Sequence, residues 1–262
     1  LGVDRAWLAA HPMHVLTESQ DARVDMMVAQ RQLGHPVAYL IGKREFFSRE
    51  FEVGPEVLIP RPETETLVEA ALRPGGACPG NLEAGGRGPI SALDLGTGSG
   101  VLAITLACEN PGLKVTATDS SDAALAVARR NAKSLAAGVE FLHGPWYAPV
   151  AGRRFDLIVS NPPYVAAGDP HLVHGDLRFE PAHALTDGSA DGLDSIRAIA
   201  AGAAAHLNPG GRLLVEHGYD QARAVAGILA AAGFTDLVSI PDLAGIPRVA
   251  GGTLGSQSES RT

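Results

Sequence analysis

The chain has 262 residues, of which 45% are hydrophobic and 19% charged, so it is long and apolar enough to bury a substantial core. Its 21 basic residues against 29 acidic ones give a formal net charge of −8, which disfavours a nucleic acid partner because phosphate binding normally needs a basic face. Two cysteines without a CxxC spacing, no membrane-length apolar stretch and no signal-peptide layout predict a cytoplasmic protein with no membrane partner.

Residues 1–36 predict a small helical segment. Apolar residues fall roughly on one side of 21–33, and a shorter helix is expected at 6–10. The second helix should end at Gly34-His35-Pro36, because glycine and proline terminate helices.

Residues 37–61 predict a β-hairpin that connects this segment to the rest of the chain. Apolar and polar residues alternate from Phe46 to Ile59, and Gly54-Pro55 lies where we expect the turn. A helix should begin after Arg61, because Pro62 suits a first helical position and acids follow it.

A mobile loop is expected at 73–89, where about half of the residues are glycine or proline, and a disordered tail at 255–262. Between them, strands alternate with helices, which predicts a mainly parallel, doubly wound α/β sheet with ligands at the carboxyl ends of its strands. We expect strands near 90–95, 114–119, 139–142, 155–160, 211–216 and 235–240, and helices near 100–109, 122–136, 190–206 and 219–232.

The first of these strands leads into a glycine turn typical of a nucleotide-cofactor site, Gly96-Thr97-Gly98-Ser99-Gly100. Val101 stands where a dinucleotide fingerprint needs its third glycine, which argues against NAD. Asp94 would place a carboxylate near any phosphates, so it suits a cationic sulfonium and an amino group better.

The second strand ends in Asp119, whose carboxylate could accept hydrogen bonds from both ribose hydroxyls of an adenosine-containing cofactor. Alternatively, Asp119 is only an acid before the next helix, which Ser120-Ser121-Asp122 can cap. Its position at a strand end favours the ribose role.

The fourth strand is followed directly by Asn161-Pro162-Pro163-Tyr164. An amide or aromatic NH2 is a poor nucleophile because its lone pair is delocalised. The Asn161 side-chain oxygen and the Pro162 carbonyl could accept both of its N–H bonds and turn the lone pair toward a methyl donor, while Tyr164 covers the planar group. The alternative is that these residues only break the chain after a strand.

Several segments together resemble the PrmC/HemK family of S-adenosylmethionine-dependent methyltransferases. They are the stretches 39–46 (YLIGKREF) and 58–65 (LIPRPETE), the turn 94–100 (DLGTGSG), Asn161 to Tyr164, Phe179-Glu180-Pro181 and Glu216-His217-Gly218. The resemblance covers about residues 36–254 in order. It implies methylation of the glutamine amide in the Gly-Gly-Gln motif of class-1 peptide chain release factors, which would be the protein partner.

The resemblance also implies a fold and a set of site residues. The fold would be a class I methyltransferase domain with a seven-stranded sheet at 62–254, a hairpin connector and an N-terminal helical domain, shortened in this chain, that docks the substrate. S-adenosylmethionine would be held by Asp94, Gly96, Thr97, Gly98, Ser99, Gly100, Asp119, Trp146 and Asn161. Asn161, Pro162, Pro163 and Tyr164 would hold the glutamine amide, with Glu63 and Thr64 at the edge of the same pocket.

The chain departs from the family pattern at Pro145, where an acid often accepts from the adenine amino group, and Trp146 could also be a plain hydrophobic anchor. Glu180 and Glu216 are left outside the catalytic set, because an acid after a strand is commonly a cap or a surface charge. No metal is expected, since His11-x-x-His14 and His171-x-x-His174 have loose spacing for metal ligands and no partnering cysteine or well-placed acid.

Three other functions stay open. A ribosomal-protein glutamine methyltransferase would share the fold and the Asn-Pro-Pro-Tyr motif, but Arg61-Pro62-Glu63-Thr64-Glu65 resembles the release-factor branch. A nucleic-acid methyltransferase acting on adenine or guanine would need a basic surface and a way to extrude the base. A non-catalytic module that binds S-adenosylmethionine is disfavoured by the intact motif at 161–164.

Overall fold

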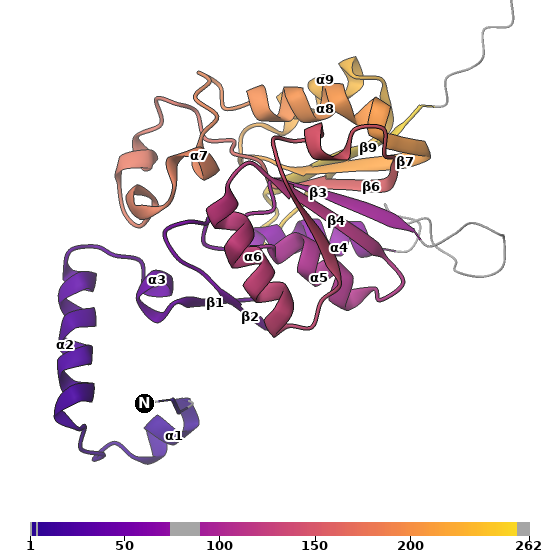
Figure 1. The fold of residues 1–262 in the computed structure, drawn as a ribbon. Helices are drawn as coiled ribbons and strands as arrows, with labels where there is room; N and C mark the ends of the chain where they lie inside the picture. Colours follow the sequence, from indigo (N-terminus) through magenta and orange to yellow (C-terminus); the bar gives the residue numbers. More distant parts are fainter. Residues whose placement is uncertain (1, 4, 74–89, 256–262) are drawn as a thin grey trace, which may run out of the picture.

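The computed structural model describes residues 2–3, 5–73 and 90–255 (Figure 1). The loop predicted at 73–89 and the tail predicted at 255–262 therefore lie almost wholly outside the described residues. Within the described ranges, no helix combines the length and the apolar character needed to cross a bilayer.

A seven-stranded sheet forms the centre of the chain, in the order β5-β4-β3-β6-β7-β9-β8. Neighbouring strands from β5 to β7 are parallel, and β9 is antiparallel to both β7 and β8. The prediction of a mainly parallel α/β sheet is thus confirmed. The strands are β3 (Ser91–Leu95), β4 (Lys114–Asp119), β5 (Val139–His143), β6 (Phe155–Ser160), β7 (Leu207–Glu216), β8 (Phe234–Pro241) and β9 (Pro247–Leu254).

Helices cover both faces of this sheet (Figure 1). One face carries α4 (Glu65–Leu72), α5 (Val101–Glu109) and α6 (Asp122–Ser134), and the other carries α8 (Asp194–His206) and α9 (Ala222–Ala231). Each face buries its own apolar cluster, one around Leu67, Leu106 and Leu157 and the other around Leu93, Ile158 and Ile196. The strands are hydrophobic on both sides because both sides are covered.

Strand β9 was not predicted, because Gly251 and Gly252 weaken the strand pattern of its sequence. The structure shows why glycine stands there. A Cβ atom on Gly251 would lie 2.5 Å from the Leu213 carbonyl oxygen, and one on Gly252 would lie 2.9 Å from that of Thr235. The neighbouring strands therefore leave no room for a side chain at either position.

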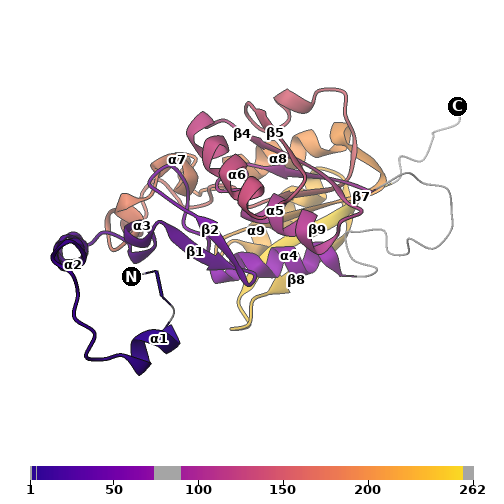
Figure 2. The ribbon, with the colours of Figure 1, turned by 60° about the horizontal axis from the view of Figure 1, so that its bottom comes forward.

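The N-terminal segment contains α1 (Arg5–Ala10), α2 (Glu18–Gln32) and the short helix α3 (Val37–Ile41). Both views show α1 and α2 standing away from the sheet (Figures 1 and 2). Helix α2 begins at a capping box formed by Thr17 and Gln20, which satisfies backbone donors of its first turn. The predicted domain boundaries at 36/37 and 61/62 remain a prediction.

The hairpin connector consists of β1 (Lys43–Phe46) and β2 (Arg49–Glu52), and the turn predicted for it at Gly54-Pro55 is wrong. The turn is Phe47-Ser48, with φ angles of 49° and 59°. A tertiary contact outweighs the unfavourable turn residues, because the Glu65 carboxylate accepts the Phe47 backbone N–H at 2.7 Å. Gly54 instead begins a separate turn that Val57 N closes on its carbonyl oxygen at 3.1 Å.

Candidate active site

The carboxyl ends of three adjacent strands meet at one edge of the sheet. Leu95 of β3 is in register with Thr118 of β4 on one side and with Ser160 of β6 on the other. The Ser160 hydroxyl donates to the Leu95 carbonyl oxygen at 2.7 Å and ties two of these ends together. Such an edge, where the strand order changes direction, is where open α/β sheets bind ligands.

The glycine turn after β3 is held in a conformation that requires glycine. Gly96, Gly98 and Gly100 have φ angles of 72°, 56° and 85°. The backbone N–H groups of Gly96 and Thr97 both donate to the Thr118 carbonyl oxygen, at 2.9 and 3.0 Å. The turn is therefore fixed to β4 and presents its backbone to the space above the strand ends.

Asp119 lies at the end of β4 beside this turn. One carboxylate oxygen accepts the Gly98 N–H at 2.8 Å, and the other accepts the Ser121 N–H at 2.8 Å. Because each carboxylate oxygen has two acceptor sites, both can still take a ligand hydroxyl. The alternative role as an acid before a helix and the ribose role are thus compatible in one side chain.

Asp94 is fully buried beneath the turn rather than exposed to the space above it. Its Oδ2 atom accepts from the Thr97 hydroxyl at 2.6 Å and from the Ala103 N–H at 3.3 Å. Burial raises the pKa of this carboxyl to about 7, while the Thr97 and Ala103 hydrogen bonds oppose the rise. Asp94 acts on the site by holding Thr97 and the start of α5 in place.

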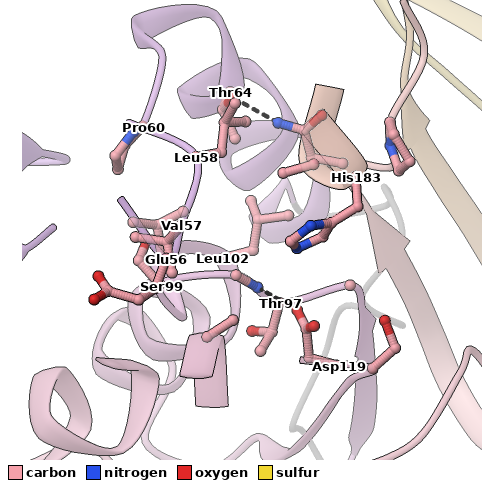
Figure 3. A pocket seen from close by; sticks show the side chains of 18 of the residues that line it. Glu56, Val57, Leu58, Pro60, Thr64, Thr97, Ser99, Leu102, Asp119 and His183 are labelled. Carbon is pink, nitrogen blue, oxygen red and sulfur yellow. Dashed lines mark hydrogen bonds between the residues drawn. The ribbon is translucent and has the colours of Figure 1, made fainter. Parts of the chain in front are cut away.

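A pocket of about 260 Å³ opens above the glycine turn and the strand ends (Figure 3). Figure 3 shows Thr97 and Asp119 on one side and Thr64 on another, with His183 pointing in from α7 (Ala182–Leu185). The predicted residues that line it are Gly96, Thr97, Gly98, Ser99, Asp119, Trp146, Asn161, Pro163 and Thr64. Segments from six separate parts of the chain therefore enclose one space.

Trp146 has a backbone φ of 43°, which is unusual for a bulky residue. Its carbonyl oxygen accepts from the Thr118 hydroxyl at 2.9 Å, and its ring packs against the apolar cluster beside β3. A Cβ on Gly96 would lie 3.5 Å from the same ring. The ring thus both anchors on the core and forms a wall of the pocket.

Asn161 follows β6 and lines the pocket. Its Nδ2 atom donates to the Thr64 hydroxyl at 3.1 Å, drawn as a dashed line in Figure 3. Its Oδ1 atom is buried and has no hydrogen-bond partner within the described part of the chain. A buried acceptor without a partner costs free energy, so this oxygen is suited to a ligand N–H.

Tyr164 ends the same motif but does not line the pocket. Its hydroxyl donates to the Glu216 Oε1 atom at 3.2 Å, and burial raises the pKa of the phenol. Glu216 is 1% exposed, at the end of β7. Burial raises the pKa of its carboxyl to about 7, and the hydroxyls of Thr64 and Tyr164 oppose that rise.

Glu180 joins the segment after the hairpin to the far side of the site. Its side chain is completely buried, accepts the Ile59 N–H at 2.9 Å and forms an ion pair with Arg61. Leu58 and Pro60, which flank Ile59, line the pocket. The buried carboxylate therefore fixes one wall of the pocket through the backbone.

Some predicted residues do not line the pocket, and some lining residues were not predicted. Asp94, Gly100, Pro162 and Tyr164 lie outside the lining, and so does Glu63. The unpredicted lining residues are Glu56, Val57, Leu58, Pro60, Val101, Leu102, Ser120, Ala124, Pro145, His183 and Ala184. The stretch at 58–65 contains Leu58 and Pro60, and Pro145 was noted as a departure from the family pattern. Phe179-Glu180-Pro181 lies just before His183, but no sequence pattern marks His183 itself.

No group of three or more His, Cys, Asp or Glu residues among the described positions could hold a metal ion. His171 pairs with Asp169 at 2.7 Å, and the His11 ring stacks on Trp7 with centroids 4.3 Å apart. These histidines thus have local contacts at the surface.

Two family models match the chain. The model of the PrmC N-terminal domain matches residues 1–42, and that of the methyltransferase small domain matches residues 87–185. The release factor glutamine methyltransferase of Burkholderia pseudomallei is 51% identical over 97% of this chain and 88% of its own length. That of Xylella fastidiosa strain Temecula1 is 49% identical over 96% of this chain and 88% of its own length.

Solved structures support the fold. A methyltransferase from Pyrococcus furiosus has a TM-score of 0.57 at 20% identity and covers 91% of this chain and 100% of its own. The Thermus thermophilus 16S rRNA N2 G1207 methyltransferase, in complex with AdoMet and guanosine, has a TM-score of 0.59 at 22% identity and covers 81% of this chain and 50% of its own. At these identities the likeness shows a methyltransferase fold alone.

Proposed function

This chain belongs to the release factor glutamine methyltransferase family, and we propose that it methylates the side-chain amide nitrogen of the glutamine in the Gly-Gly-Gln motif of class-1 peptide chain release factors. These relatives match 96% and 97% of the chain, and the PrmC N-terminal domain model matches residues 1–42. The proposed methyl donor is S-adenosylmethionine, and the proposed partner is the release factor itself.

The observation that carries this proposal is the state of the Asn161 amide. One of its N–H groups donates to Thr64, and its oxygen is buried at the pocket without a partner among the residues that the structure describes. A carboxamide NH2 entering the pocket would supply the missing donor. The Pro162 carbonyl follows directly in the chain and would accept the second N–H, because proline keeps a carbonyl oxygen but no N–H.

The residues of the pocket fit S-adenosylmethionine. The glycine turn allows close approach of a ligand to the backbone, Asp119 keeps acceptor sites for ribose hydroxyls, and the Trp146 ring offers a flat apolar surface for adenine. Asp94 supports the turn from beneath through Thr97. Pro145 offers no carboxylate to the adenine amino group, so a backbone carbonyl would have to accept there.

When bound, S-adenosylmethionine supplies a sulfonium methyl group, so the reaction breaks one C–S bond, forms one C–N bond and releases one amide proton to water. The protein contributes position rather than acid–base chemistry. With both N–H bonds held by Asn161 and Pro162, the nitrogen lone pair is turned toward the donor side of the pocket. Pro163 would close the wall of the pocket behind the amide.

The test is incubation of the protein with labelled S-adenosylmethionine and an intact class-1 release factor, followed by peptide mapping. Parallel reactions would contain a ribosomal protein fraction, duplex DNA and rRNA. We expect label on the glutamine of the Gly-Gly-Gln peptide. Label confined to nucleic acid or to ribosomal protein would overturn the proposed substrate.

Asn161→Ala is the matched variant for this assay. We expect kcat to fall on the order of 100-fold, the size seen when one well-placed polar group is removed from a transition state, while cofactor affinity is largely retained. Asn110→Ala is the control, because Asn110 lies at the far end of α5 from the glycine turn and its side chain accepts the local Gly112 N–H at 3.2 Å. An Asn161→Ala variant as active as this control would contradict the proposed grip on the amide.

A further inference from the structure

The Asn161 side-chain amide could fit its place in either of two orientations. The oxygen and nitrogen of an asparagine side chain have nearly the same shape, so a 180° turn of the amide fits the same space. Only hydrogen-bond partners can decide which atom faces the pocket. The partner on the inner side is the Thr64 hydroxyl, 3.1 Å from Nδ2.

Thr64 is 1% exposed, and its hydroxyl has one proton to donate and can also accept. If that proton is committed to another acceptor, Asn161 must present its N–H to Thr64, which turns Oδ1 toward the pocket. The buried Glu216 carboxyl at the end of β7 is close enough for the Thr64 hydroxyl to lower its pKa, so it is the candidate acceptor.

Glu216 is suited to hold that proton, because an ionised carboxylate accepts hydrogen bonds and donates none. Its Oε1 atom accepts from the Tyr164 hydroxyl at 3.2 Å. Its Oε2 atom is buried and has no hydrogen-bond partner within the described residues, so it can still accept a hydrogen bond. The nearby Thr64 hydroxyl lowers the pKa of the same carboxyl and so favours its charged form. Both polar side chains of the 161–164 motif are therefore connected to the Glu216 carboxylate. Tyr164 donates a hydrogen bond to it directly, and Asn161 is connected to it through Thr64.

We propose that Glu216 is a positioning residue that, through Thr64 and Tyr164, sets the direction of the hydrogen bonds that turn the Asn161 oxygen toward the substrate amide. The inference rests on the proposed function for its substrate. It assigns Glu216 no contact with substrate or cofactor, and Glu216 does not line the pocket.

The charge state of Glu216 predicts a pH dependence of kcat that a purely structural role would not produce. The charged and titratable groups that act on it are Glu63, which favours its protonated form, Arg248, which favours its charged form, and the Tyr164 hydroxyl. Arg248 is itself paired with Asp242 at 3.0 Å. A protonated Glu216 could donate to Thr64, which removes the constraint on Asn161. The kcat of the wild-type protein should therefore fall as the pH drops below about 7, the value to which burial raises the Glu216 pKa.

The test compares Thr64→Val, Thr64→Ser and Glu216→Gln in the release-factor assay, with cofactor binding measured separately. Thr64→Val keeps the shape but lacks the hydroxyl, so kcat should fall at least about tenfold with little change in cofactor affinity. Thr64→Ser should recover most of that loss. Glu216→Gln should lower kcat to a similar extent and abolish the fall at low pH. Wild-type kcat in Thr64→Val, or equal impairment of Thr64→Ser and Thr64→Val, would overturn the proposal.

A second measurement separates this inference from the proposed function. The side-chain NH2 resonances of Asn161, assigned in the 15N-labelled protein by comparison with Asn161→Ala, report the hydrogen bond to Thr64 without any substrate. They should shift in both Thr64→Val and Glu216→Gln, and return toward wild type in Thr64→Ser. If the wild-type protein transferred no methyl to release factors, only the proposed function would fail. Unshifted Asn161 resonances in both variants would overturn the positioning role.

Discussion

The glycine turn offers a prediction that separates protein stability from cofactor binding. Gly98 and Gly100 both have positive φ, but their surroundings differ. A Cβ on Gly98 would meet no atom of the described residues within 4 Å. One on Gly100 would lie 2.7 Å from Ile104 Cδ1 and 3.2 Å from Ala128 Cβ. Alanine at the two positions should therefore have different effects.

The stability costs can be worked out step by step. A left-handed alanine costs about 1–2 kcal/mol, and the loss of unfolded-state freedom on replacing glycine returns about 0.4–1 kcal/mol. Gly98→Ala should thus lower the free energy of unfolding by only about 1 kcal/mol. Gly100→Ala adds overpacking of about 1–3 kcal/mol, since Ile104 can move its terminal methyl but Ala128 cannot move aside, for a total of about 2–4 kcal/mol.

Cofactor affinity should respond differently at the two positions. Gly98 lines the pocket, so its new methyl group would occupy space that a ligand needs, and the affinity for S-adenosylmethionine should fall at least about tenfold, or 1.4 kcal/mol. Gly100 does not line the pocket. Urea denaturation measures the first quantity and titration calorimetry the second. Equal stability of the two variants, or wild-type affinity in Gly98→Ala, would refute this reasoning.

Three further predictions follow from buried polar groups. Asn131 accepts the Glu52 N–H at 2.7 Å and donates to the carbonyls of Glu52 and Ser99 at 3.0 and 2.9 Å. Asn131→Ala should therefore lower the free energy of unfolding by about 2–3 kcal/mol, measured by urea denaturation. A loss below about 0.5 kcal/mol would mean that water replaces these bonds. Glu180→Gln keeps the size of the side chain but removes the charge that pairs with Arg61. Limited proteolysis should therefore cut the segment 53–61 faster in this variant than in wild type. An unchanged rate of cleavage would show that apolar contacts alone hold the segment. Burial raises the pKa values of Asp94 and Glu216 to about 7. The folded protein therefore retains protons that the unfolded chain releases near pH 4. As a result, the free energy of unfolding should fall as the pH rises from about 4.5 to about 7. Glu216→Gln should reduce this slope, and an identical slope in the variant would contradict the pKa rise of Glu216.

The sheet was predictable from sequence wherever a local pattern specifies the structure. Strands β3, β4 and β6 match their predicted positions within one residue, because each is a short run that is apolar or rich in β-branched residues and is bounded by a turn. Strand β9 and the hairpin turn could not be predicted from sequence, because contacts with distant parts of the chain decide their conformations. The Leu213 carbonyl excludes a side chain at Gly251, and Glu65 binds the Phe47 N–H.

The same distinction holds at the site. The glycine turn, Asp119 and Asn161 could be placed together from sequence, because the carboxyl ends of adjacent parallel strands meet at one edge. The hydrogen bond between Asn161 and Thr64 could not, since 97 residues separate them. Glu216 was set aside as a surface or capping acid, and only the fold reveals that it is buried beside Tyr164.

The segment from Gly54 to Thr64 forms one side of the pocket. Directional hydrogen bonds hold it near its middle and at or next to both of its ends. Glu180 accepts the Ile59 N–H near its middle, Thr64 bonds Asn161 at one end, and Asn131 holds Glu52 just before the other. Apolar contacts tolerate small shifts, whereas a hydrogen bond weakens steeply as its angle and length change. A segment held in this way can keep Leu58 and Pro60 against the pocket at a fixed distance from the glycine turn. This rigidity is what transfer between two bound groups requires, because a misplacement of about 1 Å can cost on the order of 100-fold in rate.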